Sequence, residues 1–333
     1  LLDGIDPIAT KAIAAIYARD PYIGPPAATP EYRDPWISER GDFANTGSDL
    51  SYEPSGIVQK WQKDLGNGAV DAPIVSSGGR IFAVTSGIAS SGSYTTDSKL
   101  FCLDPSGEVL WSAPVGRGHQ TASPLLWDYT VYVASDDGKL YAFDQETGSE
   151  LWTYTVTSGG ISASPLTFRN LLIVTADDGT ITAVTAKGAR AWSRSIGTTA
   201  SATPALFDVT LYVPGGDGSL YAVAGDGSKV EWSVKVGGAL NAPVAMNDRL
   251  IVTYSDPAGT GSGGGAASIS YDGSIVWKAT TASNAGQAAV SKQGAVSISS
   301  QGLSMLSLDG SVRWTASYGS ETPGGSPVTV NGM

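Results

Sequence analysis

The side chains best suited to chemistry gather in loops that recur along the chain. His119 is the single histidine of the 333 residues, and it stands in GRGHQTASP beside Arg117 and Gln120. Asp71 and Asn241 occupy the matching loop in other copies of a repeated unit. Such groups can donate and accept hydrogen bonds, whereas one histidine gives little support to a zinc site or a Ser-His-Asp triad. We therefore expect polar contacts at the mouth of a central channel, with a plain exposed loop as the alternative.

The one cysteine, Cys102, gives no sign of redox or metal chemistry. A single cysteine forms no internal disulfide and no cysteine-based metal cage. Cys102 falls in KLFCL, where sister segments carry Ala142, Ala183 and Ala222. We therefore expect it to be a small, inward-facing residue of a sheet.

Charge and composition exclude several classes of partner. The formal net charge is −11 and only 15% of residues are charged. Nucleic-acid and anionic membrane surfaces need clustered lysine and arginine, so neither is expected as a partner. Few lysines, one cysteine and an acidic pI favour an extracytoplasmic location in the periplasm, outer envelope or cell surface. A membrane anchor ahead of Leu1 is left open.

A repeat of about 40 residues must position these loops. Seven tryptophans recur at spacings of 50, 41, 40, 40, 45 and 37 residues. A glycine stands four residues before five of them, and a proline follows six of them by 11 to 13 residues. The repeated residues are Trp61, Trp111, Trp152, Trp192, Trp232, Trp277 and Trp314.

Within one unit, residues 121–154, the hydrophobic period is two, which predicts four short strands separated by turns. The pair Asp137-Gly138 recurs at the same turn in two later units, and we expect it to form a two-residue hairpin. Four-stranded antiparallel units at this period predict an all-β protein, a β-propeller. Seven blades are favoured, with eight as the alternative. The tryptophans should fill the wedge between neighbouring blades on the outermost strands.

The two ends depart from the repeat. Trp61 is expected in a fourth strand and GGSPVTV (324–330) in a first strand, so that both termini share an incomplete last blade. The propeller then spans residues 51–333. Residues 1–50 form an N-terminal arm, with a helix over 7–19 and an extended, proline-rich stretch over 20–36. The arm should lie across the propeller or dock on a partner.

The pattern of Ser-Pro, VYVAS, DDG, LYAFD and ELW resembles the pyrroloquinoline-quinone-like (PQQ-like) propeller repeat, and the resemblance covers residues 36–333. It implies one of two branches. The first is the quinoprotein dehydrogenases. The second comprises non-catalytic propellers, such as the lipoprotein of the outer-membrane barrel-assembly machine and related surface proteins.

The enzymatic branch implies adjacent cysteines over the cofactor and a set of calcium ligands. Here Cys102 stands alone, and the acidic residues recur at turn positions, where turn chemistry explains them. They include Asp136, Asp137, Asp177, Asp178 and Asp217. We therefore expect a non-enzymatic scaffold or subunit of an envelope assembly, without a cofactor. A PQQ-dependent oxidoreductase and a carbohydrate- or peptide-binding propeller remain the alternatives.

Two insertions account for the long spacings, at 86–98 and 255–268. Both are rich in Gly and Ser and fall between the second and third strands of their units, so they should share one face of the disc. Loops on a rigid scaffold often carry recognition. We expect these loops and the 1–50 arm to contact other protein subunits, and membrane association of that assembly is left open. Tolerated, mobile insertions are the alternative.

Overall fold

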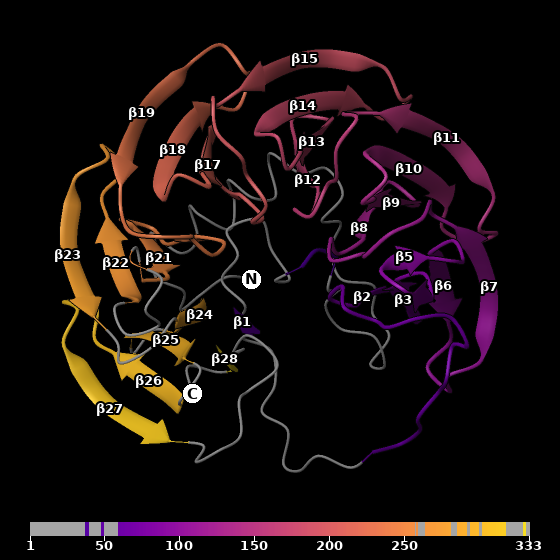
Figure 1. The fold of residues 1–333 in the computed structure, drawn as a ribbon, viewed down its shortest axis with the longest axis horizontal. Coiled ribbons are helices and arrows are strands. Elements are labelled where there is room, and N and C mark those ends of the chain that lie inside the picture. The colour runs from indigo at the N-terminus through magenta and orange to yellow at the C-terminus, as the bar shows by residue number, and fades with distance from the viewer. Residues whose placement is uncertain are drawn as a thin grey trace, which may run out of the picture.

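The computed structural model describes residues 37–39, 48–49, 59–256, 258, 264–280, 285–291, 294–299, 302–317 and 329–330. The predicted helix at 7–19 and the stretch at 20–36 lie outside these ranges. The described part is all β and contains six four-stranded antiparallel sheets. They follow one another around a central axis as the blades of a propeller, each with its first strand nearest the axis (Figure 1).

The six blades, numbered in chain order, have these strands. Blade 1 is β2 (Val75–Ser77), β3 (Arg80–Thr85), β6 (Lys99–Leu103) and β7 (Val109–Pro114); blade 2 is β8 (Leu125–Trp127), β9 (Thr130–Ala134), β10 (Lys139–Asp144) and β11 (Glu150–Thr155); blade 3 is β12 (Leu166–Phe168), β13 (Leu171–Thr175), β14 (Thr180–Thr185) and β15 (Arg190–Ser195). Blade 4 is β16 (Ala205–Phe207), β17 (Thr210–Pro214), β18 (Ser219–Ala224) and β19 (Val230–Lys235); blade 5 is β20 (Val244–Ala245), β21 (Leu250–Tyr254), β22 (Gly265–Ile269) and β23 (Ile275–Thr280); blade 6 is β24 (Ala285–Ser291), β25 (Gly294–Ser299), β26 (Gly302–Leu306) and β27 (Val312–Ser317).

The middle strands are buried because neighbouring blades cover both of their faces. In blade 2, every residue of β9 is buried, whereas β11 alternates between exposed and half-buried residues. One apolar cluster joins Phe82 and Leu100 of blade 1 to Val133 and Phe143 of blade 2. A single blade cannot bury both faces alone, so the ring of contacts stabilises each sheet.

The turn chemistry differs from the prediction. In the Asp137-Gly138 turn only the glycine has a positive φ, 80°, and Gly138 N–H donates to Ser135 O within a longer connection. The two-residue hairpin lies instead between first and second strands. There Asp128 and Tyr129 have φ values of 52° and 54°, the geometry of a type I′ turn. The expectation was wrong because the Asp-Gly turn needs one left-handed residue rather than two.

Six of the seven repeated tryptophans lie on outermost strands, as predicted, and five of these six contact the following blade. Trp152 Nε1 donates to Ala186 O at 2.9 Å, and its ring lies over Gly188 of blade 3. Gly188 has φ of 79°, and a β-carbon there would lie 2.9 Å from Cδ2 of Trp152. The glycine that precedes one tryptophan in the sequence is therefore covered by the ring of the previous tryptophan along the chain. We call this set of contacts the outer rim.

Trp61 makes the same contact without the predicted strand. Its Nε1 donates to Pro105 O at 2.9 Å and its ring covers Gly107, yet residues 59–64 contain no strand. An outermost strand needs a third strand to pair with, and none lies beside this segment among the described sheets. Residues Thr329–Val330 (β28) pair in parallel with Ser48–Asp49 (β1) in a two-stranded sheet. The seventh blade stays a prediction.

The insertions take different forms. Residues 86–98 lie between β3 and β6, as expected, and include the small hairpin β4 (Ala89–Ser90) and β5 (Ser93–Tyr94). The predicted boundary of the second insertion, 255–268, is wrong at its end, because β22 begins at Gly265. All five residues of β22 are buried and pair with β21 and β23, so these small side chains belong to the sheet.

Candidate functional site

One face of the propeller carries the predicted contact residues. The turns between second and third strands and the connections from one blade to the next meet there, because successive strands are antiparallel. We call it the loop face. His119 Nε2 donates to Asp71 Oδ2 at 2.9 Å, which joins the loops that enter blades 1 and 2. Both side chains are about half exposed, at 53% and 40%, so the pair lies at the surface.

Gln120 is buried beneath this pair. Its Nε2 donates to Ser98 Oγ at 3.3 Å and to Ser135 Oγ at 3.1 Å, and its backbone N–H donates to Ser86 Oγ at 3.0 Å. These bonds tie the loop entering blade 2 to the second turns of blades 1 and 2. Its Oε1 accepts no hydrogen bond in the structure. Gln120 therefore positions the loops and is not available to a ligand at the surface.

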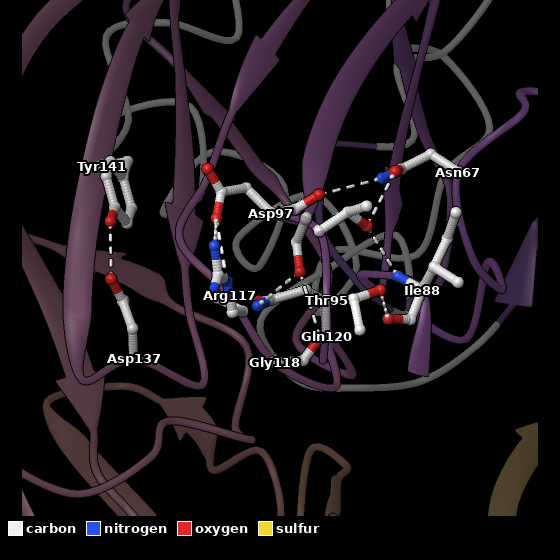
Figure 2. Close-up of polar contacts among 11 residues, drawn as sticks. Asn67, Ile88, Thr95, Asp97, Arg117, Gly118, Gln120, Asp137 and Tyr141 are labelled. Carbon is white, nitrogen blue, oxygen red and sulfur yellow. Dashed lines mark hydrogen bonds and ion pairs between the residues drawn. The ribbon is translucent and has the colours of Figure 1, made fainter. Parts of the chain in front are cut away.

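Arg117 pairs with the 86–98 insertion. Its guanidinium lies 3.1 Å from Asp97 Oδ1, and both side chains are more than half exposed. Figure 2 shows how the insertion is held: Ile88 O accepts from the Thr95 hydroxyl, and the Asn67 amide donates to Asp97 O at 3.2 Å. Ile88 itself is 44% exposed. The insertion is thus hydrogen-bonded into a defined shape that presents an apolar side chain.

Asn241 lies in another sector of the loop face. It belongs to the loop entering blade 5, where its Nδ2 donates to Thr253 Oγ1 at 2.9 Å and its N–H donates to Thr253 O at 3.0 Å. The structure thus gathers Asp71, Arg117, His119 and Gln120 around blades 1 and 2. Asn241 instead braces its own blade.

The recurring aspartates act as hydrogen-bond acceptors in turns. Asp177 accepts from Ser162 N–H at 2.9 Å and from the Ser162 hydroxyl at 3.0 Å. Asp137 accepts from the Tyr141 hydroxyl at 2.6 Å, as Figure 2 shows. Burial, followed by this bond to a carboxylate, raises the pKa of Tyr141, so its hydroxyl stays protonated and keeps donating. Among the described residues, no three His, Cys, Asp or Glu side chains come together as metal ligands would.

Cys102 is an inward-facing residue of its sheet, as the alanines at the equivalent positions of other repeats predict. It is fully buried and lies opposite Trp111 in the register, as Ala142 lies opposite Trp152. Burial raises the pKa of the thiol, and the Arg80 guanidinium, 3.8 Å from Sγ, only partly opposes this. The thiol form is therefore favoured, which makes Cys102 a poor nucleophile.

Sequence reasoning missed one contact residue, Glu39. Its Oε2 accepts hydrogen bonds from the hydroxyls of Ser164 and Thr203, which precede the first strands of blades 3 and 4. The repeated Ser/Thr-Pro pairs marked the positions of these hydroxyls, but nothing in the sequence pairs them with a carboxylate that lies 125 residues from Ser164 and 164 residues from Thr203.

The comparisons with known proteins identify the family. The family model described as outer membrane protein assembly factor BamB matches residues 96–203 and 177–332, more than half of the chain. The chain belongs to this family. The crystal structure of BamB from Moraxella catarrhalis has 19% sequence identity, a TM-score of 0.63, and coverage of 78% of this chain and 77% of its own. A search of curated proteins finds no match.

This similarity to BamB confirms the fold, a propeller of PQQ-like repeats. The outer rim and the polar loop face described above thus belong to a BamB-family propeller. In the part of the chain that the structure describes, no helix has the length and apolar character needed to cross a membrane.

Proposed function

We propose that this BamB-family propeller is a non-enzymatic, extracytoplasmic scaffold that binds protein subunits of an outer-membrane assembly. The observation that carries the proposal is the family match over residues 96–332. The hydrogen bonding of the loop face supports the non-enzymatic part of this proposal. Its polar side chains bind one another, as in the His119–Asp71 and Arg117–Asp97 pairs. A rigid disc of this kind suits the presentation of surfaces.

The partner surface is assigned to the loop face around blades 1 and 2. Ile88 is exposed on a hydrogen-bonded insertion that also carries Asp97, the ion-pair partner of the exposed Arg117. An apolar side chain with a polar surround is the usual anatomy of a protein contact. The pre-formed loop would lower the entropic cost of binding.

Site-specific photocrosslinking in cells of the source organism tests this surface. A photoreactive amino acid at position 88 should crosslink to a component of the outer-membrane barrel-assembly machinery, identified by mass spectrometry. The matched control is position 129, a residue that is 75% exposed in a turn between first and second strands, on the opposite face. Equal crosslinking from both positions, or none from position 88, would contradict the proposal.

A separate assay addresses enzymatic function. Pyrroloquinoline quinone and Ca²⁺ added to the purified protein should leave the quinone absorbance unchanged, and no dye should be reduced with alcohols or sugars. Quinone binding with alcohol-dependent dye reduction would instead assign the chain to the enzymatic branch of the repeat family.

A further inference from the structure

Residues 37–39 lie along the inner side of the propeller, where the chain contacts three successive blades. The first strand of each blade pairs with its second strand and turns its other edge toward the axis. At that edge of β8, Leu126 N–H donates to Ile37 O at 3.0 Å. The indigo segment beside β8 in Figure 1 marks this place. Ile37 thus adds a short extended segment to the inner edge of blade 2, and its side chain packs against the core between blades 1 and 2.

Glu39 ends this segment at a pair of oriented hydroxyls. Ser164 Oγ donates to Glu39 Oε2 at 2.6 Å and accepts from Ser123 N–H at 2.8 Å. Thr203 Oγ1 also donates to Glu39 Oε2 and accepts from Ser164 N–H at 2.9 Å. Because each backbone N–H occupies an acceptor site of the hydroxyl, the single hydroxyl proton is directed toward the carboxylate. Two donors pre-aligned on one point make a carboxylate site.

The segment that occupies this site fits it imperfectly. Ser38, between Ile37 and Glu39, is only 5% exposed, and its hydroxyl has no hydrogen-bond partner in the structure. A buried hydroxyl without a partner lowers the stability of the bound segment. A similar segment with an apolar residue in the middle would keep the contacts of Ile37 and Glu39 without this cost.

We propose that the inner edge of β8 and the hydroxyls of Ser164 and Thr203 form a binding site for an extended segment of a partner protein, and that residues 37–39 occupy it as an internal, displaceable ligand. The partner segment carries an apolar residue, a small apolar residue and then a carboxylate. This inference rests on the proposed scaffold function, since it assigns the chemistry of one partner contact.

Fluorescence anisotropy with synthetic peptides tests the site. The probe is a labelled peptide with the sequence of residues 33–43, RDPWISERGDF. Glu39→Ala weakens the internal ligand, so this variant should bind the probe about tenfold more tightly than the natural chain does. A probe with alanine in place of Ser38 should bind Glu39→Ala about fivefold more tightly still. Adding Ser164→Ala and Thr203→Val to Glu39→Ala should abolish this gain.

Two outcomes of the peptide-binding assay would overturn the inference. One is equal probe binding by Glu39→Ala and the triple variant; the other is no binding by Glu39→Ala at millimolar concentrations. A probe with glutamine in place of Glu39 is the matched ligand control, and it should bind about tenfold more weakly, because a neutral amide oxygen is a poorer acceptor than a carboxylate. Thermal melting of each variant separates loss of the site from loss of the fold.

Backbone hydrogen exchange provides a second readout that needs no peptide. The Leu126 amide should exchange faster in Glu39→Ala, since its acceptor is Ile37 O, whereas the Ser123 amide should change only in Ser164→Ala. Unchanged protection of Leu126 would mean that residues 37–39 are a fixed part of the fold, which contradicts the inference. Probe binding without crosslinks from position 88 would sustain the site while refuting the scaffold role proposed for the loop face.

Discussion

The outer rim and the loop face hold neighbouring blades together in different ways. At the rim, one pair of residue types repeats: an indole lies over a glycine of the following blade in six successive contacts, from Trp61–Gly107 to Trp277–Gly310. On the loop face the junctions differ, as in the His119–Asp71 pair between the loops entering blades 1 and 2 and the bond from the Thr121 hydroxyl to Ser162 O between the loops entering blades 2 and 3. The comparison teaches that the rim joins the blades through one repeated contact, whereas the polar contacts on the loop face differ from place to place.

The one exception at the rim supports this division. The turn that receives Trp192 has an extra residue after Gly227, and the Trp192 N–H is buried without a partner. The Arg194 guanidinium donates instead to the carbonyls of Gly227 and Ser228. The packing of ring on glycine is kept although its hydrogen bond is replaced, so the packing is the essential part of the contact.

Removing an indole from the outer rim tests most directly whether the rim stabilises the propeller more than the loop face does. Trp152→Ala deletes a ring that packs on Gly188 and on the core between blades 2 and 3, and it should lower the free energy of unfolding by about 3 kcal/mol. Trp314, which is 44% exposed, is the control, and its replacement by Ala should cost about 1 kcal/mol. Urea denaturation measures both; equal losses would mean that the rim contact contributes little.

Adding a methyl group to the glycine that Trp152 covers should cause the next largest loss of stability. Gly188→Ala combines a left-handed backbone with a clash against Trp152, and should cost about 2–3 kcal/mol. Gly197→Ala is the matched control, because Gly197 has φ of 81° but no atom within 4 Å of the added carbon. It should cost about 1 kcal/mol. If thermal melting gives equal losses for the two variants, steric contact with the ring is not the cause.

Acid should weaken the rim turns through their aspartates. Hydrogen bonds from turn residues hold the pKa of these carboxyl groups below the usual value; for Asp144 the backbone N–H of Thr147 is the main donor. The other four are Asp104, Asp226, Asp272 and Asp309. A lowered folded-state pKa stabilises the fold above the unfolded pKa of about 3.9, and that contribution is lost as the pH falls through the folded value.

The urea midpoint should therefore fall as the pH is lowered from about 5 to about 2. Asp144→Asn keeps acceptors for the turn but does not titrate, so its midpoint should fall less over the same range. A drop as large as that of the natural chain would show that Asp144 takes no part in the acid effect.

The smallest effect is expected on the loop face. His119→Ala removes an exposed hydrogen bond to Asp71, and such surface contacts contribute about 0.5 kcal/mol or less. Urea denaturation at neutral pH should therefore give nearly the natural midpoint. A loss comparable to that of Trp152→Ala would mean that the loop face, too, maintains the ring.

The repeat could be predicted from the sequence because its physical causes are local. Strand alternation and the in-phase tryptophans and glycines gave the blades, the outermost position of Trp152 and the buried position of Cys102. The partner of each glycine could not be predicted, since Gly188 receives a ring from the preceding unit. The missing strand at Trp61 and the contact of Glu39 with Ser164 depend on segments far apart in the chain, about which local patterns carry no information.

The rim contacts all run in one direction along the chain, so the fluorescence of each tryptophan reports on a neighbouring blade. The indole on the outermost strand of one blade touches the turn of the blade that follows it, so its emission reports on the sheet after its own. Melting confined to blade 3 would thus be seen first in the fluorescence of Trp152, which blade 2 carries.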